Sequence, residues 1–158
     1  AEQYLAKVNK TVEQDMLPIH TNNVVIDAIL NQKYTLATSK NIKMYFDIQD
    51  MQNSKVDVTT MVSILSHGLN NAIEACEKVE GDRVIELRII NEEHELIISI
   101  ENTVEQDVVI VDNTIPTSKK DKENHGIGLE SIKNIVDQCD GQFFLESANK
   151  TFKMLVVL

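Results

Sequence analysis

The fold is decided by the stretch Leu65-Ser66-His67-Gly68-Leu69-Asn70-Asn71-Ala72-Ile73-Glu74-Ala75, within a segment, 58–79, whose apolar residues recur at helical spacing. One side of this helix is apolar, and the other carries His67, Asn70, Asn71, Glu74 and Lys78. Asparagine is a poor helix former, so a merely solvated face would more readily use Lys, Glu or Gln. Its amide offers an oxygen to a hard cation and a donor to phosphate. The pair Asn70-Asn71 therefore predicts a ligand-binding face, with a solvated face as the alternative.

A second candidate site is His125-Gly126-Ile127-Gly128-Leu129, which opens a helix expected at 129–139. Two glycines let backbone amides approach a ligand closely, and a helix N-terminus attracts an anion. The stretch is not a Walker A loop, since no Gly-Lys-Ser/Thr follows, and not a dinucleotide fingerprint, since the third glycine is absent. It predicts a phosphate-binding turn, with a plain connection from loop to helix as the alternative.

The segment 103–125 has no sustained periodicity, and loops longer than ~12–15 residues are usually functional or mobile. It carries Lys119, Lys120 and Lys122 in a chain whose net charge is −10. This local cationic patch predicts a lid over a polyphosphate, and the alternative is a solvated loop. Just before the segment, the amide of Asn102 could pair with the edge of a base, whereas the alternative is a turn residue.

The rest of the chain alternates between helical and strand periodicity. An amphipathic helix is expected at 1–17, ended by Pro18, and another at 24–40, capped by Asn22 and Asn23. Strands are expected at 42–48, at 83–90 and 95–102 as an antiparallel hairpin, and at 142–147 and 151–158. A doubly wound parallel sheet fits poorly, because several neighbouring strands are joined by hairpins too short for a parallel crossover. We expect a two-layer α/β (α+β) sandwich, with a mixed, largely antiparallel sheet covered on one face by helices.

Composition limits the functional classes. The 158 residues are 42% hydrophobic, which suits a single domain with a real core. With 15 basic against 25 acidic residues, general nucleic-acid binding is disfavoured. The longest apolar run, Met154–Leu158, is far shorter than the ~20 residues of a membrane span, so we expect a soluble chain. No initiator Met opens the sequence, so we expect a fragment.

Cys76 and Cys139 lie in expected helices without metal-ligand spacing, so we expect buried, reduced thiols.

Taken together, these segments resemble the ATP-binding catalytic domain of sensor histidine kinases, in the GHKL superfamily shared with gyrase, MutL and the ninety-kilodalton heat-shock chaperones. The stretch 65–75 is similar to the N box of that family, and Gly126-Ile127-Gly128-Leu129 is similar to its G2 box. The segment 25–33 resembles the lead-in of peptide-sensing kinases of the accessory-gene-regulator, or quorum-sensing, type. The resemblance covers about 20–158. It implies a Bergerat-type ATP-binding catalytic domain at 19–158, preceded at 1–18 by the end of a helical dimerisation hairpin.

The resemblance also implies a site. Asn71 would coordinate Mg²⁺ on the ATP phosphates, and the glycines would let the turn approach these phosphates. The other residues implied at the ATP site are His67, Asn70, Glu74, Asn102, Lys119, Lys120, Lys122, His125, Gly126, Ile127, Gly128 and Leu129. Two positions depart from the family pattern. Asn102 replaces the Asp of an Asp-x-Gly motif that pairs with the adenine amino group, and Glu74 stands where many transmembrane kinases have Lys.

Histidine kinases transfer the γ-phosphate of ATP to a His on the helical hairpin, for relay to an Asp of a response-regulator receiver domain. The resemblance therefore implies a catalytic fragment of a homodimeric membrane receptor, on the cytoplasmic side. The helix that should carry the phosphoacceptor His is absent, and His20 follows Pro18 at a helix junction, so it is not nominated. The imidazole is already a nucleophile at neutral pH, so no general base is expected here. The alternatives are a non-catalytic response-regulator docking module and a superfamily Ser kinase or ATPase.

Overall fold

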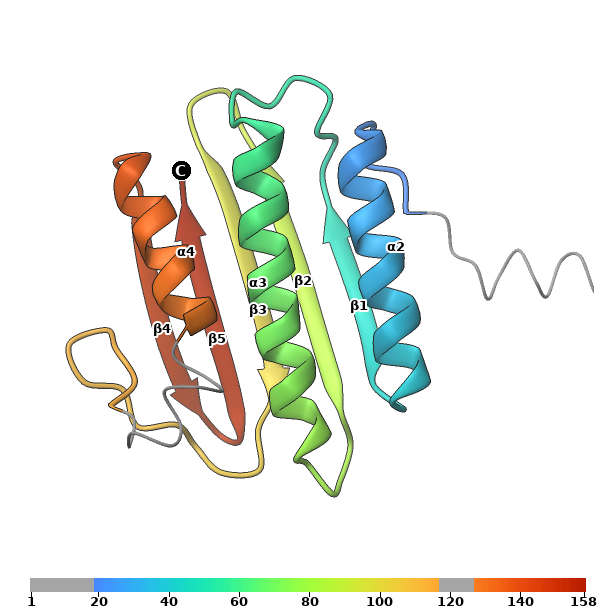
Figure 1. Cartoon of the computed structure of the whole chain (residues 1–158), viewed down its shortest axis with the longest axis vertical. Coiled ribbons are helices and arrows are strands. Elements are labelled where there is room, and N and C mark those ends of the chain that lie inside the picture. The colour runs from blue at the N-terminus through green and yellow to red at the C-terminus, as the bar shows by residue number, and fades with distance from the viewer. Residues whose placement is uncertain (1–18, 117–126) are drawn as a thin grey trace, which may run out of the picture.

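The computed structural model describes residues 19–116 and 127–158, and the helix expected at 1–17 lies outside them. Three helices and five strands make up this part of the chain (Figure 1). In chain order they are α2 (Val24–Ser39), β1 (Lys43–Ile48), α3 (Val58–Glu77), β2 (Val84–Asn91), β3 (Leu96–Thr103), α4 (Ile127–Gln138), β4 (Gln142–Ala148) and β5 (Thr151–Val157). Every element lies within two residues of its expected bounds.

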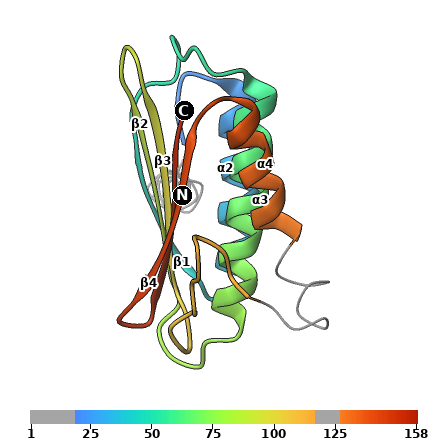
Figure 2. The same cartoon turned by 90° about the vertical axis from the view of Figure 1, so that its left-hand side faces the viewer.

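The five strands form one sheet in the order β1-β2-β3-β5-β4. β1 and β2 are parallel, because α3 carries the chain back between them, and the other three pairs are antiparallel. All three helices cover the same face of this sheet (Figure 2). The predicted fold class is thereby confirmed, including the β2–β3 hairpin.

Local chemistry fixes where α2 begins. The Asn23 side chain accepts hydrogen bonds from the backbone N–H groups of Val25 and Ile26, at 3.1 and 3.2 Å, as a helix cap does. The Asp27 carboxylate accepts from both the N–H and the hydroxyl of Thr21, each at 2.7 Å. These bonds hold the chain that enters α2 against the helix.

The core fills the space between helices and sheet, and α3 lies at its centre. Alternate residues of β2 and β3 are buried, as expected for a sheet with one covered face. Gly68 lets α3 approach the sheet closely. A Cβ atom there would lie 2.6 Å from Ile100 Cδ1 and 3.0 Å from Met154 Cε. The glycine of the quoted stretch is thus a packing residue beneath the two asparagines.

Both cysteines are free, but only one is buried. Cys76 is buried in α3 as predicted. The prediction for Cys139 is wrong, because α4 ends at Gln138 and the chain turns there, past the stripe that buries Ile132 and Val136. Its side chain is exposed.

The segment 104–116 contains no helix and no long strand, as expected, but it is tied firmly to β4. Asp112 and Asn113 adopt left-handed backbone angles, with φ of 50° and 59°, in a tight turn bridged by Val111 and Thr114. The Asn113 amide donates to the Phe143 carbonyl and accepts from Leu145 N–H at 2.7 Å. One side chain thus pairs with the β4 backbone as a neighbouring strand would.

None of the helices in the described ranges combines the length and the apolar character needed to cross a lipid bilayer.

Candidate functional site

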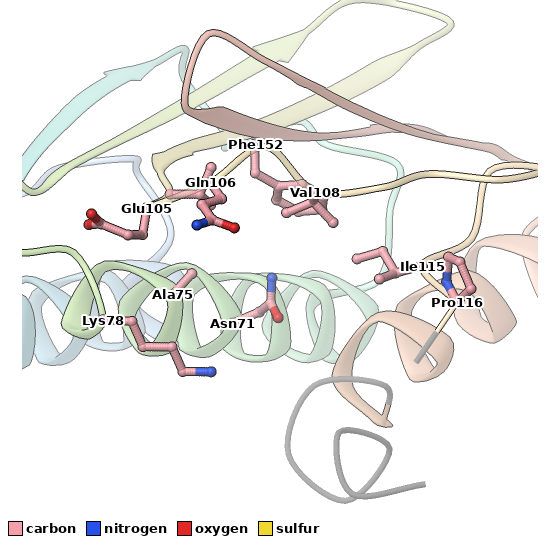
Figure 3. Close-up of a pocket in the computed structure, with 10 residues that line it drawn as sticks. Asn71, Ala75, Lys78, Glu105, Gln106, Val108, Ile115, Pro116 and Phe152 are labelled. Carbon is pink, nitrogen blue, oxygen red and sulfur yellow. The ribbon is translucent and has the colours of Figure 1, made fainter. Parts of the chain in front are cut away.

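A cavity of about 340 Å³ opens between α3 and the segment that follows β3 (Figure 3). Its volume falls in the range of small-molecule sites. α3, the 104–116 segment and β5 contribute its walls, which are formed by Asn71, Ala75, Lys78, Val104, Glu105, Gln106, Val108, Ile115, Pro116 and Phe152. Residues far apart in the sequence therefore meet at one concave site.

The cavity combines apolar walls with a few polar groups at α3. Val108, Ile115 and Phe152 offer surfaces suited to a flat organic ring. Asn71 points from α3 toward the cavity, opposite Gln106 (Figure 3). The Glu105 carboxylate is already engaged, since it accepts from the N–H of Glu80 at 3.2 Å. The arrangement suits a ligand with an apolar ring and a polar or metal-bound portion.

The quoted stretch sends its polar side chains in different directions. Asn71 lines the cavity, whereas half-buried His67 and exposed Glu74 do not. Asn70 turns toward α2, where its oxygen accepts a hydrogen bond of 2.6 Å from the Lys33 ammonium. The structure therefore brings one of the four predicted N-box residues to the cavity wall.

Asn102 lies in β3 and is only 2% exposed, so the alternative of a turn residue is wrong. Its amide donates to the Thr103 carbonyl at 3.1 Å. It does not line the cavity, but its cross-strand neighbour Phe152 does. Asn102 thus lies next to the cavity wall.

The predicted phosphate-binding turn leads into α4, which begins at Ile127. A Cβ atom on Gly128 would lie 3.8 Å from the His67 carbonyl oxygen, so the start of α4 packs against α3 one turn before Asn71. Leu129 is buried beneath this contact. The predicted residues Lys119, Lys120, Lys122, His125 and Gly126 lie outside the described residues.

The donor set at the cavity fits one kind of metal ion. The described residues contain no cluster of three or more His, Cys, Asp or Glu side chains that could hold an ion alone. Asn71 supplies one neutral oxygen. Mg²⁺ commonly takes only one or two protein ligands and completes its shell with water and substrate phosphates. The site therefore fits Mg²⁺ delivered with a polyphosphate.

The GHKL domain family matches residues 56–158, which include α3, the cavity segments and α4. The chain belongs to the GHKL domain family. No curated protein matches its sequence.

Solved structures with this GHKL fold are distant in sequence. The catalytic domain of the histidine kinase ThkA is 16% identical, with a TM-score of 0.63 over 84% of this chain and 92% of that one. The mycobacterial sensor histidine kinase MprB is 14% identical, with a TM-score of 0.62 over 85% and 92%. Histidine kinase AdeS of Acinetobacter baumannii is 13% identical, with a TM-score of 0.63 over 85% and 62%. The chain is a GHKL domain whose fold is that of histidine-kinase catalytic domains.

Sequence reasoning missed most of the cavity wall of this GHKL domain. Val104, Val108, Ile115 and Phe152 carry no local signal, because any strand or loop contains such residues and only the topology brings them together. Lys33 was also missed, although a lysine within the apolar spacing of Ile26, Leu30 and Ala37 was a readable signal. A charged residue on an apolar helix stripe indicates a polar partner within reach, here Asn70.

Proposed function

We propose that this domain binds Mg²⁺-ATP in the cavity beside Asn71 and is the catalytic domain of a two-component sensor histidine kinase. It would pass the γ-phosphate to a His on the dimerisation hairpin of its own or a partner chain. A response-regulator receiver Asp would then accept it. The observation that carries the proposal is Asn71, which lines an apolar-walled cavity of a GHKL domain next to the start of α4.

Each part of the cavity has a role in this proposal. The apolar walls at Val108, Ile115 and Phe152 would hold the adenine ring. Asn102, buried behind the wall residue Phe152, would have to turn toward the cavity to accept a hydrogen bond from the adenine amino group. Asn71 holds Mg²⁺, and the turn into α4 at Gly128 faces the phosphates. The other predicted residues, His67, Asn70, Glu74, Ile127 and Leu129, and Lys119, Lys120, Lys122, His125 and Gly126 of the preceding segment, complete the site as proposals.

Phosphoryl transfer depends mainly on position and on charge neutralisation, with little covalent chemistry from the protein. Bound Mg²⁺ would neutralise phosphate charge. Asn71 would hold that ion, the α4 N-terminus adds backbone donors, and the apolar walls exclude water. The acceptor imidazole attacks without a general base. In superfamily members that activate water or a hydroxyl, Glu stands where this chain has His67, so the sequence favours a histidine acceptor over a Ser kinase or ATPase.

The experiment is a calorimetric titration with a non-hydrolysable ATP analogue, with and without Mg²⁺. We expect Mg²⁺-dependent micromolar binding that Asn71→Ala abolishes. Asn31→Ala is the matched control, because Asn31 lies in helix α2 and, among residues 19–116 and 127–158, its amide donates only to the Asp27 carbonyl. Binding by this control should equal that of wild type.

The absence of binding at millimolar Mg²⁺-ATP would overturn the proposal and favour the non-catalytic docking module, which the neutral Asn102 motivates. If binding is found, incubation with ATP and a separately supplied hairpin should yield an acid-labile phosphohistidine. An acid-stable product would instead indicate a Ser kinase. Robust labelling of the chain alone would contradict the expectation that none of the histidines within 1–158 is the phosphoacceptor.

We also propose the quorum-sensing receptor subgroup, on the resemblance of 25–33 to its lead-in. The domain would then lie on the cytoplasmic side of a dimeric membrane receptor. In the full-length protein in lipid vesicles, an extracellular peptide should change the rate of autophosphorylation. If no peptide secreted by the cells that make this protein changes the autophosphorylation rate, the subgroup assignment is contradicted, while the kinase proposal stands.

A further inference from the structure

Lys33 occupies an unusual place in α2. The buried stripe of this helix consists of Ile26, Leu30, Lys33 and Ala37. Lys33 is 8% exposed, and it is the one charged side chain among the buried residues of the described ranges. Its ammonium donates to Asn70 Oδ1 at 2.6 Å. The aliphatic stem of Lys33 therefore lies within an apolar helix contact, while its ammonium reaches Asn70, which is itself exposed.

This burial is costly for the ammonium. The ion pairs within 19–116 and 127–158 join Lys40 to Glu77 and Arg88 to Asp47, so no carboxylate neutralises Lys33 there. Burial lowers the pKa of Lys33 below its ordinary value, because a desolvated ammonium is less favoured than one in water. A methionine of similar length would fill the same space without this penalty. Stability alone does not explain the ammonium.

The effect of the ammonium falls on α3 next to Asn71. Asn70 and Asn71 are adjacent, so they share one helical turn but point about 100° apart. Asn70 faces α2 and is held there by Lys33, whereas Asn71 faces the cavity on the other side. A hydrogen bond to a charged group is stronger and more directional than a neutral one. It resists rotation of α3 about its axis, and such a rotation would move Asn71 out of the cavity.

We propose that Lys33 is a positioning residue for the metal-binding Asn71, which it orients through Asn70. This inference rests on the proposed function, because it assigns Asn71 to Mg²⁺. Partners hydrogen-bonded directly to a metal ligand commonly contribute 10- to 100-fold to metal affinity; Lys33 acts one residue further away, through Asn70, so the expected effect lies at the lower end, about tenfold.

The test compares Lys33→Met with wild type in three titrations: the ATP analogue with Mg²⁺, the same analogue in EDTA, and adenosine. We expect Lys33→Met to lose about tenfold of the gain that Mg²⁺ gives to analogue binding. Adenosine affinity and the urea midpoint should not fall. Asn70→Leu should have the same effect, and the double variant should be no worse than either single variant.

The matched control is Lys40→Met. Lys40, the C-cap of α2, also joins this helix to α3 through its ion pair with Glu77, the last residue of α3, and it is partly exposed. If Lys33 acts on Asn71, Lys40→Met keeps the Mg²⁺ gain. An equal loss in Lys40→Met would show that the docking of the two helices is what matters, and would overturn the inference.

Other outcomes are equally decisive. A full Mg²⁺ gain in Lys33→Met would overturn the inference but leave the proposed function standing, whereas no nucleotide binding by wild type would remove both. A fall in adenosine affinity or in the urea midpoint would indicate a general structural role and overturn it. Weaker binding of metal-free analogue with an intact Mg²⁺ gain would indicate that the ammonium attracts phosphate directly, which would also overturn it.

Discussion

At the scale of single residues, burial separates the two thiols of the chain. Burial raises the pKa of Cys76 above its ordinary value of 9.0, and its sulfur contacts the carbonyls of Val84 and Thr103 at 3.7 and 3.6 Å. Cys139 is exposed. Since the thiolate is the reactive form, the two thiols should differ in both access and charge.

We predict that Ellman's reagent at pH 8 modifies one thiol of the native protein quickly and the second only in denaturant. Cys139→Ser should remove the fast phase, and Cys76→Ser should leave it unchanged. Because the folded pKa of Cys76 is raised, its contribution to stability is present below pH 9.0 and is lost as pH rises through the folded value. Native rates for the two thiols within about tenfold of each other would contradict the predicted burial.

At single residues, the sequence predicted which side chain could bind a ligand but not which way each side chain points. The spacing of 65–75 placed Asn71 on a polar helix face, and the structure places it at the cavity. The same reasoning assigned Asn70 to the ligand-binding face as well, because helical periodicity does not show which neighbouring helix a side chain contacts. Lys33, which donates a hydrogen bond to Asn70, lies 37 residues before it in the sequence.

At the scale of elements, the contact between α4 and the sheet depends on Gly141. A Cβ atom there would lie 2.5 Å from the Val157 carbonyl oxygen and 3.0 Å from Val136 Cγ1. The backbone oxygen cannot move without disturbing β5. Gly81, by contrast, has no atom within 4 Å of such a Cβ and lies in the turn before β2.

We predict that Gly141→Ala lowers the free energy of unfolding by about 1–3 kcal/mol, as overpacking does. Gly81→Ala is the control and should change it by less than about 0.5 kcal/mol, or raise it slightly. Urea denaturation measures both. Equal effects of the two substitutions would show that chain flexibility, and not the Val157 contact, accounts for the loss.

Element boundaries were predictable because apolar periodicity reflects burial against one layer, and each helix and strand of the described ranges follows it. The order of the strands in the sheet was not predictable. Nothing in 151–158 indicates that β5 lies between β3 and β4, since a hairpin from β4 to β5 is compatible with either side. The hydrogen bonds between the Asn113 side chain and the β4 backbone were equally unpredictable. Asparagine is common in turns, and its two partners are 30 and 32 residues away.

At the scale of the whole molecule, one core runs from α2 to β5. It includes Ile26 near the start and Val156 near the end. The chain that enters α2 is also anchored, since Met51 N–H donates to the Thr21 carbonyl at 2.7 Å. We therefore propose that 19–158 is a complete folding unit.

We predict that removing 1–18 changes the unfolding free energy by less than about 0.5 kcal/mol, or roughly 1–2 °C in midpoint, with one cooperative transition in scanning calorimetry. A chain that starts at residue 28 is the contrast, because it lacks Ile26 and the Thr21–Asp27 bonds, and it should melt well below wild type. If removal of 1–18 alone causes such a loss, the domain boundary is placed wrongly.

The strand order has a consequence for how this domain is made. β5 is the last of the five described strands to leave the ribosome, yet it pairs with both β3 and β4 in the interior of the sheet. Until residues 151–157 emerge, β3 has one open edge and β4 has no strand partner. Unpaired strand edges invite association with other chains. A nascent chain that stalls before β5 is complete is therefore prone to aggregate. Truncations within 151–157 should consequently be as damaging to folding as truncations in the middle of the domain.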